Sequence, residues 1–330
     1  MLLAGDVGGT KTLLGLFAYD AERPRPVVVR EYATVDFDTL DDIVDVFLDE
    51  TRASTIDAVV VGAAGPVVNL VARLSNTPFV ADLAVVVERL GDCPAALLND
   101  LEAMAWAVPV LEAEELAVLQ VGIREPDGHA ALIAAGTGLG EAFLHNLDGR
   151  FVPSPTEAGH ADFAARTARE AAFVEQFTRM HGRVDVERVL SGRGLVNLFR
   201  FTHGPADSRR VCEGVGRDVD ESDLPAEIST SALDGRCTRC VEALNMFVEA
   251  YGAEAGNLAL RTMASAGVYI GGGIAPKILP ALRRGTFLDA FLAKEPMTDF
   301  LRTVPVAVIL NHHAALLGAA VHAAQLRAGR

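Results

Sequence analysis

The distribution of apolar and polar residues over the first hundred positions predicts short strands that alternate with helices. Residues 2–5 and 13–19 are apolar and flank a glycine-rich turn, which is the pattern of a β-hairpin. In 39–52, apolar side chains recur at the spacing of an amphipathic helix. Further strands are expected at 27–29, 58–62 and 95–98, and further helices at 79–90 and 101–108.

A second cycle with the same opening begins near residue 130. An apolar strand at 130–135, a glycine turn that contains a threonine, and a returning strand at 141–144 repeat the first hairpin in miniature. This weak internal similarity predicts two related halves that face one another. Helices are expected at 168–180, at 238–266 with an interruption near Gly252, and at 313–326, and a strand at 268–270. The polar and weakly patterned stretch 204–233 is interpreted as a surface excursion.

The composition supports an α/β protein with two domains. The chain has 330 residues, of which half are hydrophobic and only 6% aromatic, a mixture typical of Val- and Leu-rich buried strands with glycine turns. Lys and Arg number 29 against 44 Asp and Glu, and the net charge of −15 disfavours nucleic acid and anionic membranes as partners. No apolar run approaches the ~18 residues of a membrane span. Asp6 and Lys11 come too early for a signal peptide, so we expect a cytoplasmic protein.

The first candidate for chemistry is the turn of the opening hairpin, GDVGGTKT. Glycines at Gly8 and Gly9, followed by Thr10 and Lys11, let backbone N–H groups form an anion-binding concavity. Asp6, at the end of the strand, is placed to hold Mg²⁺ directly or through its waters. The spacing is not that of a Walker A loop. A plain hairpin turn with two glycines is the alternative.

The second candidate is the turn in AAGTGLGEA, where Gly136, Gly138 and Gly140 alternate and Thr137 offers a hydroxyl. The spacing misses the dinucleotide pattern by one position, and strand-like residues follow in place of a helix. A hairpin that cradles phosphate fits better. Two such turns, each opening a domain-sized cycle, predict a nucleotide held from two sides in a cleft between the halves.

The third candidate is LLNDLEA, in which a buried strand runs into Asn99 and Asp100 as a helix begins. A carboxylate at the carboxyl end of a strand is well placed to accept a proton from a substrate hydroxyl. The alternative is that Asp100 only caps the helix that follows.

Two further segments carry polar groups or glycines beside turns. Glu157 and His160 in PTEAGHADF, with Glu187 downstream, suit a sugar, whose hydroxyls donate as well as accept hydrogen bonds. A structural histidine is the alternative for His160. In VYIGGGIAP a buried strand ends in Gly271, Gly272 and Gly273, whose bare backbone would admit the flat face of an adenine. An ordinary strand-to-helix turn is the alternative here.

In this order the five segments resemble the bacterial glucokinase family, within the superfamily of hexokinases, actin and heat-shock chaperones, over nearly the whole chain. The resemblance implies an α/β, two-domain actin-like ATPase (ribonuclease H-like) fold with an interdomain cleft. The small domain would comprise 1–110 and the C-terminal helix 312–330, and the large domain 111–311. A homodimer is implied as well.

The resemblance also implies an activity, in which the 6-hydroxyl of glucose is phosphorylated by ATP with Mg²⁺. The ATP phosphates would be held by the two glycine turns, at Asp6, Gly8, Gly9, Thr10 and Lys11 and at Gly136, Thr137 and Gly138. Gly271, Gly272 and Gly273 would line the adenosine pocket. Asn99 and Asp100 would bind the sugar, with Asp100 as general base, together with Glu157, His160 and Glu187.

The sequence departs from the family pattern at three positions. Lys11 stands where Asn is frequent, Ala158 where Gly is usual, and Arg193 where Pro is usual. Lys11 makes the first turn similar to the sister family of repressors and open-reading-frame kinases, which commonly carries a zinc site. Here the pair Cys237-x-x-Cys240, with Cys212 about 25 residues upstream, is a poor zinc signature. We therefore expect free buried thiols.

Three alternatives to a glucokinase remain open at this point. The same chemistry could act on another hexose or on an N-acetyl amino sugar, which a panel of sugars would distinguish. A non-catalytic sugar sensor or regulator usually has an N-terminal helix-turn-helix, for which there is no room before Gly5. A nucleotide-driven binding protein similar to actin would hydrolyse ATP without sugar.

Overall fold

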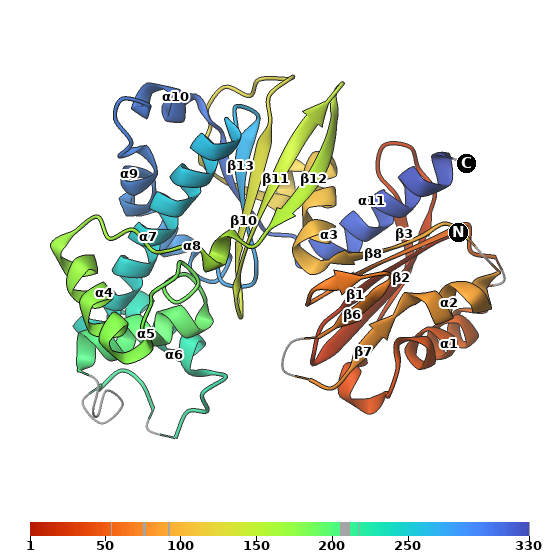
Figure 1. Cartoon of the computed structure of the whole chain (residues 1–330), viewed down its shortest axis with the longest axis horizontal. Coiled ribbons are helices and arrows are strands. Elements are labelled where there is room, and N and C mark those ends of the chain that lie inside the picture. The colour runs from red at the N-terminus through yellow and green to blue at the C-terminus, as the bar shows by residue number, and fades with distance from the viewer. Residues whose placement is uncertain (54, 75–76, 92, 205–211, 217, 330) are drawn as a thin grey trace. The chain divides into compact units, whose positions relative to one another are not determined.

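The computed structural model describes residues 1–53, 55–74, 77–91, 93–204, 212–216 and 218–329. It divides into two compact units, each built on its own main sheet (Figure 1). The first unit comprises Met1–Glu115, Phe151–Pro155 and Asn311–Arg330, and the second Leu116–Arg150 and Thr156–Leu310. Both units combine helices with a sheet, so the predicted α/β class is confirmed.

The first unit contains a five-stranded sheet with the order β3-β2-β1-β4-β8. Its strands are β1 (Leu2–Val7), β2 (Lys11–Ala18), β3 (Arg25–Ala33), β4 (Ala58–Ala63) and β8 (Ala95–Asn99). The predicted hairpin is confirmed, because β1 pairs antiparallel with β2. On its other side β1 pairs parallel with β4, and β4 pairs parallel with β8. A small second sheet has the order β5-β6-β7, from β5 (Val67–Val68), β6 (Val71–Arg73) and β7 (Val80–Asp82).

Helices cover both faces of the five-stranded sheet (Figure 1). One face carries α1 (Leu40–Thr51) and α2 (Leu83–Leu90), and the other α3 (Asp100–Ala107) and α11 (Ala314–Ala328). Because side chains of a strand alternate between the faces, Leu3 packs with α1 and α2 while Leu2 packs with α3 and α11. Burial on both faces explains why these strands are apolar almost throughout.

The helix expected at 79–90 begins later than predicted. Residues Val80–Asp82 form β7, and the Asp82 side chain accepts the backbone N–H of Ala84 at 3.0 Å, which starts α2 at Leu83. An aspartate at this N-cap position satisfies a backbone donor that the helix cannot. The apolar spacing alone did not separate the strand from the helix.

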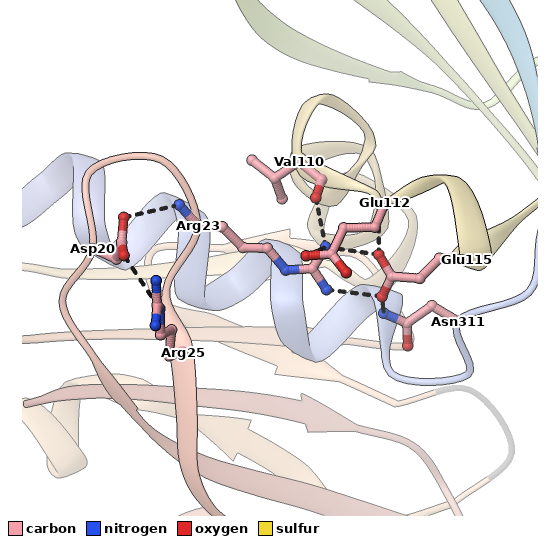
Figure 2. Close-up of polar contacts among 7 residues, drawn as sticks. All are labelled: Asp20, Arg23, Arg25, Val110, Glu112, Glu115 and Asn311. Carbon is pink, nitrogen blue, oxygen red and sulfur yellow. Dashed lines mark hydrogen bonds and ion pairs between the residues drawn. The ribbon is translucent and has the colours of Figure 1, made fainter.

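A polar cluster joins the end of the first segment of the first unit, at Glu115, to the start of its last segment, at Asn311 (Figure 2). The guanidinium of Arg23 donates two hydrogen bonds to the Glu115 carboxylate, at 2.7 and 2.8 Å, and a third to the carbonyl of Val110 at 2.6 Å. Asn311 donates to the same carboxylate at 2.6 Å. The hydrogen bond from Arg23 holds the pKa of Glu115 below its usual range. Glu115, which ends one segment of the unit, and Asn311, which begins another, are therefore held in the same hydrogen-bonded cluster.

The main sheet of the second unit has six strands in the order β12-β11-β10-β13-β14-β9, although residues 151–155 of β12 are assigned to the first unit. Its strands are β9 (Leu116–Gln120), β10 (Ala130–Ala135), β11 (Leu139–Leu147), β12 (Arg150–Thr156), β13 (Gly267–Gly271) and β14 (Val306–Ile309). As β1 does in the first unit, β10 pairs antiparallel with the next strand along the chain and parallel with a later one. The two sheets thus share the same central pairing.

The helices of the second unit surround one long central helix, α7 (Thr238–Thr262) (Figure 1). The others are α4 (Ala168–His181), α5 (Gly192–His203), α6 (Leu224–Leu233), α8 (Leu279–Leu282), α9 (Thr286–Leu292) and α10 (Thr298–Thr303). The predicted interruption near Gly252 is wrong. A Cβ atom at Gly252 would lie 2.0 Å from the carbonyl oxygen of Phe287, so this glycine lets α9 pack closely against an unbroken α7.

The surface excursion predicted for 204–233 is also wrong in the part that the structure describes, whereas 205–211 and 217 lie outside it. Cys212 and Val215 are buried in the core, and α6 contributes buried Ile228 and Ala232. None of the helices in the described residues is long and apolar enough to cross a membrane.

The contact between α3 and α11 predicts the effect of one methyl group. In Gly318→Ala, the new Cβ would lie 1.7 Å from the carbonyl oxygen of Ala103. Helix propensity alone would favour alanine by about 1 kcal/mol. We expect the overlap to outweigh it and to lower the free energy of unfolding by about 1–3 kcal/mol, as measured by urea denaturation.

The matched control is Gly329→Ala in the same terminal segment, where the nearest atom would be 3.7 Å from the new Cβ. This change should alter the free energy of unfolding by less than about 0.5 kcal/mol. A stabilised Gly318→Ala variant would contradict the packing of α3 on α11.

Candidate active site

The carboxyl ends of three parallel strands in the first unit meet at one edge of the sheet. Asp6 near the end of β1 pairs in register with Gly62 of β4, and Asn99 at the end of β8 pairs with Ala63. Asp100 follows as the first residue of α3. Side chains at such an edge, where strands pass into turns and helices, form ligand sites in open α/β sheets.

Gly62 separates the two aspartates without placing a side chain between them. A Cβ atom here would lie 2.8 Å from the Cβ of Ala103 and 3.7 Å from the Cα of Asp100. Burial, and after it the charge of Asp100, raise the pKa of Asp6 to about 6, although Lys11 opposes the shift. The edge therefore holds two carboxylates that influence one another.

Asn99, not Asp100, is the N-cap residue of α3. Its side-chain oxygen accepts the backbone N–H of Leu101 at 2.9 Å, and its amide donates to the carbonyl of Gly65 at 3.4 Å. Asp100 accepts the same Leu101 N–H at 2.9 Å and remains partly accessible. Burial raises the pKa of Asp100, while the hydrogen bonds from Leu101 and Asn99 oppose that rise. Asn99 therefore caps the helix. Capping alone does not explain why an aspartate follows at position 100.

The turn between β1 and β2 leaves donors exposed. Gly8 N–H donates to the carbonyl of Lys11 at 2.9 Å and closes the turn, and the Thr34 hydroxyl donates to the Gly8 carbonyl at 2.8 Å. Within the described residues, the N–H groups of Gly9 and Thr10 have no acceptor. The Lys11 ammonium pairs with Glu31 at 3.1 Å on an exposed surface.

The turn between β10 and β11 repeats this arrangement. Gly136 N–H donates to the carbonyl of Gly138 at 2.8 Å, and the N–H groups of Thr137 and Gly138 have no acceptor in the described part of the chain. A Cβ atom at Gly138 would lie 2.6 Å from a carboxylate oxygen of Glu187. The missing side chain lets that oxygen accept the Leu139 N–H at 3.0 Å. Both turns present free N–H groups, as an anion requires.

The second unit contains a cavity of about 1110 Å³ beside its glycine turn. Of the residues predicted from the sequence to form a site, the cavity is lined by Gly136, Thr137, His160, Glu187 and Gly273. The N-terminus of α5, with Arg193, the segment after Gly273, with Lys277, and residues of α6 also line it. Neither Arg193 nor Lys277 has an ion-pair partner among the described residues.

The three glycines at the end of β13 and directly after it have different roles. Gly272 has φ +82°, and a Cβ atom there would lie 2.3 Å from the carbonyl oxygen of Ala135. The hydroxyl of Tyr251 accepts the Ala135 N–H at 3.2 Å and donates to the carbonyl of Gly271 at 3.4 Å. Gly271 and Gly272 therefore join β10 to β13, and Gly273 alone of the three lines the cavity.

Glu157 and His160 lie together on an exposed segment. Nε2 of His160 is 4.0 Å from a carboxylate oxygen of Glu157, and both side chains are largely accessible. The backbone N–H of Glu187 donates to the carbonyl of Gly159 at 2.8 Å, which brings the two predicted sugar-binding segments side by side. The site residues predicted from the sequence thus form two groups, one in each unit.

Lys277 lines the cavity, although the sequence did not predict it as a site residue. It lies four residues after Gly273 in an exposed turn, and no motif marks it. Arg193 was noted only as a departure from the family pattern. The only feature of the sequence that could have indicated Lys277 is its position, as a cation a few residues after a glycine turn.

Comparison with known proteins decides the family. A model of the family described as Glucokinase matches residues 3–326. A curated glucokinase of Nostoc punctiforme is 38% identical, with 99% of each chain covered. The chain belongs to the glucokinase family. A solved glucokinase from an Antarctic psychrotroph is 26% identical, with a TM-score of 0.85 and 98% of each chain covered.

The family assignment confirms the predicted activity and fold. The protein is an ATP-dependent glucokinase, a sugar kinase of the actin-like ATPase fold. A ROK family glucokinase from Streptomyces griseus, solved with glucose and AMPPNP, shares the fold at a TM-score of 0.62. It is 22% identical, and the match covers 98% of this chain and 99% of that one.

Proposed function

We propose that Asp100 is the general base that activates the 6-hydroxyl of glucose. The observation that carries this proposal is the strand edge of the first unit, where Asp100 is partly accessible and lies near the carboxylate of Asp6. Burial raises its pKa. A carboxylate with a raised pKa holds an accepted proton more firmly, which suits a general base at neutral pH.

Asn99, Glu157, His160 and Glu187 bind the other hydroxyls of the sugar in this proposal. One oxygen of Glu187 accepts the Leu139 N–H. A carboxylate has two oxygens, so the other is available to a hydroxyl. His160 and Glu157 offer a donor and an acceptor 4.0 Å apart. Such a set orients a sugar by hydrogen bonds whose loss rejects an analogue without the matching hydroxyl.

The same proposal assigns the phosphates of ATP to the two glycine turns. The free N–H groups of Gly9, Thr10, Thr137 and Gly138 are preorganised donors, which need no rearrangement as charge develops on the transferred phosphoryl group. The adenosine would occupy the cavity beside Gly273, with Lys277 available to a phosphate. Gly271 and Gly272 do not line the cavity, and they pack next to β10 directly before Gly273.

The residues at the strand edge fit a bound Mg²⁺. Asp6 and Asp100 are two carboxylates whose mutual repulsion a divalent cation would relieve, and Lys11 is paired with Glu31. Asp6 would hold the ion, directly or through waters. Bound there with ATP, Mg²⁺ would neutralise part of the phosphate charge.

The reaction then follows from these positions. The carboxylate of Asp100 accepts the proton of the 6-hydroxyl, and the sugar oxygen forms a bond to the γ-phosphorus in line with the bond that breaks. The electron pair of that bond leaves with ADP, and glucose 6-phosphate is the product. A homodimer and a cytoplasmic location accompany this proposal as expectations from the sequence.

Substitution of the base tests the proposal. In Asp100→Asn the amide keeps the shape and the hydrogen bonding to a sugar hydroxyl but cannot accept its proton. We expect kcat to fall at least ~10²-fold, with the KM for glucose changed by only a few-fold, in a coupled assay of ADP release across a panel of hexoses.

The control is Glu102→Gln, which removes a half-buried carboxylate from the same helix. Its kcat should stay within about threefold of the wild-type value, because a carboxylate that touches no reacting atom cannot accept the proton of the substrate. A fall of less than about tenfold for Asp100→Asn would show that another group takes the proton.

A second substitution tests the nucleotide end separately. Lys277→Gln removes a cavity cation without an ion-pair partner among the described residues, so we expect the KM for ATP to rise about tenfold or more, the usual scale for a hydrogen bond to a charged group. The KM for glucose should stay the same.

Arg284→Gln removes an exposed cation seven positions further on that does not line the cavity, and it should leave both KM values unchanged. Equal effects of the two variants on ATP would indicate a general charge effect and would contradict a phosphate contact at Lys277.

A further inference from the structure

A group of four side chains in the second unit has the composition of a metal site, although the sequence predicts free thiols there. His203 ends α5, Cys212 follows it, Cys237 is the N-cap residue of α7 and Cys240 lies in the first turn of that helix. One ligand atom from each lies within 4.8 Å of every other. His203 and Cys240 are 37 residues apart, so the four residues do not form a compact sequence motif.

The distances fit one tetrahedral ion. The sulfurs of Cys212 and Cys240 are 3.6 Å apart, and Nε2 of His203 is 3.3 Å from the sulfur of Cys237 and 4.0 Å from that of Cys240. Zinc bonds of about 2.3 Å to sulfur and 2.0–2.1 Å to nitrogen place tetrahedral ligand atoms about 3.5–3.8 Å apart. A disulfide requires a separation of about 2.05 Å, and all three cysteines are free.

The imidazole is already oriented for an ion. Nδ1 of His203 lies 2.9 Å from the carbonyl oxygen of Phe199, an acceptor that only an Nδ1–H can satisfy. This hydrogen bond directs the lone pair of Nε2 toward the three sulfurs. Metal-binding histidines are held in this way by a partner on the other ring nitrogen.

Backbone donors surround the sulfurs as they surround bound thiolates. The sulfur of Cys237 accepts the N–H groups of Arg239 and Cys240 at the start of α7, and the sulfur of Cys212 accepts that of Gly214. The positive end of a helix dipole favours negative charge at this place. His203, Cys212 and Cys240 are buried, with at most 6% of each residue exposed, so the site is closed to substrate.

From these contacts we propose that His203, Cys212, Cys237 and Cys240 bind one structural Zn²⁺ ion. Three thiolates and an imidazole form a complete four-coordinate set, which is typical of structural and not catalytic zinc. The thiols release their protons to solvent as the ion binds. The proposal stands apart from the phosphoryl-transfer chemistry, since none of the four residues lines the cavity of the unit.

The ion would hold two walls of that cavity in place. α5 begins at the cavity with Arg193 and ends at the proposed site with His203. The backbone at Gly214, two residues after Cys212, packs closely against α6, another cavity-lining helix, and against the start of α7. A Cβ atom at Gly214 would lie 2.1 Å from the hydroxyl of Ser231 near the end of α6 and 3.0 Å from the Cβ of Cys237. Zinc at these residues would therefore join α5 and the start of α7 beside α6.

Metal analysis of the full-length protein tests the proposal. The protein is purified without chelator from cells grown with added zinc, and its metal content is measured by mass spectrometry. We expect about one zinc per chain, released in full by an organomercurial reagent that modifies thiolates. Cys237→Ser and Cys240→Ser should each lose the zinc, and the control Cys93→Ser, in the first unit, should keep it.

A measurement on the unaltered chain covers the case in which the variants fail to fold. Protein stripped of metal and titrated with Co²⁺ should develop the intense visible absorption of tetrahedral thiolate-bound cobalt at one equivalent, and zinc should abolish it. Its thermal midpoint should rise on adding zinc. Folded, active protein with less than about a tenth of a zinc per chain and no cobalt spectrum would overturn the proposal, as would a Cys212–Cys240 disulfide in protein purified under reducing conditions.

Discussion

The candidate site of the first unit depends on one constraint: three parallel strands end at the same edge of a sheet, and the middle strand has a glycine there. Gly62 leaves no side chain between Asp6 and the start of α3, so two carboxylates occupy neighbouring positions. Burial and mutual repulsion raise the pKa of Asp6 to about 6. A carboxylate base and a carboxylate that suits a metal ion both follow from this local arrangement.

The two glycine turns show how a similar backbone device serves both units. Each turn is closed by a hydrogen bond from its first glycine, and each leaves two N–H groups without an acceptor in the described residues. The second turn also shows why a glycine is needed, because a Cβ at Gly138 would displace the Glu187 carboxylate. Anion binding therefore rests on backbone geometry, which a chain with a net charge of −15 can supply without a basic surface.

The sequence predicted those parts of the molecule whose signals are local. The first hairpin, the strand before Asp100 and the amphipathic α1 are each formed by one short continuous stretch of the chain, and apolar spacing with turn residues identifies them. The unbroken α7 could not be predicted, because Gly252 has the appearance of a helix breaker until Phe287 is seen beside it. The group around Cys237 was missed for a similar reason: its members approach one another only through tertiary packing.

A ¹³C NMR titration of the Asp6 carboxyl in the wild type and in Asp100→Asn tests whether the two carboxylates share this buried edge. We expect a midpoint near pH 6 in the wild type. In the variant the midpoint should move lower but stay above the ordinary value of 3.8, because burial persists while the repulsion from Asp100 is removed. A midpoint near 3.8 in both proteins would contradict a shared, buried pair of carboxylates at the strand edge.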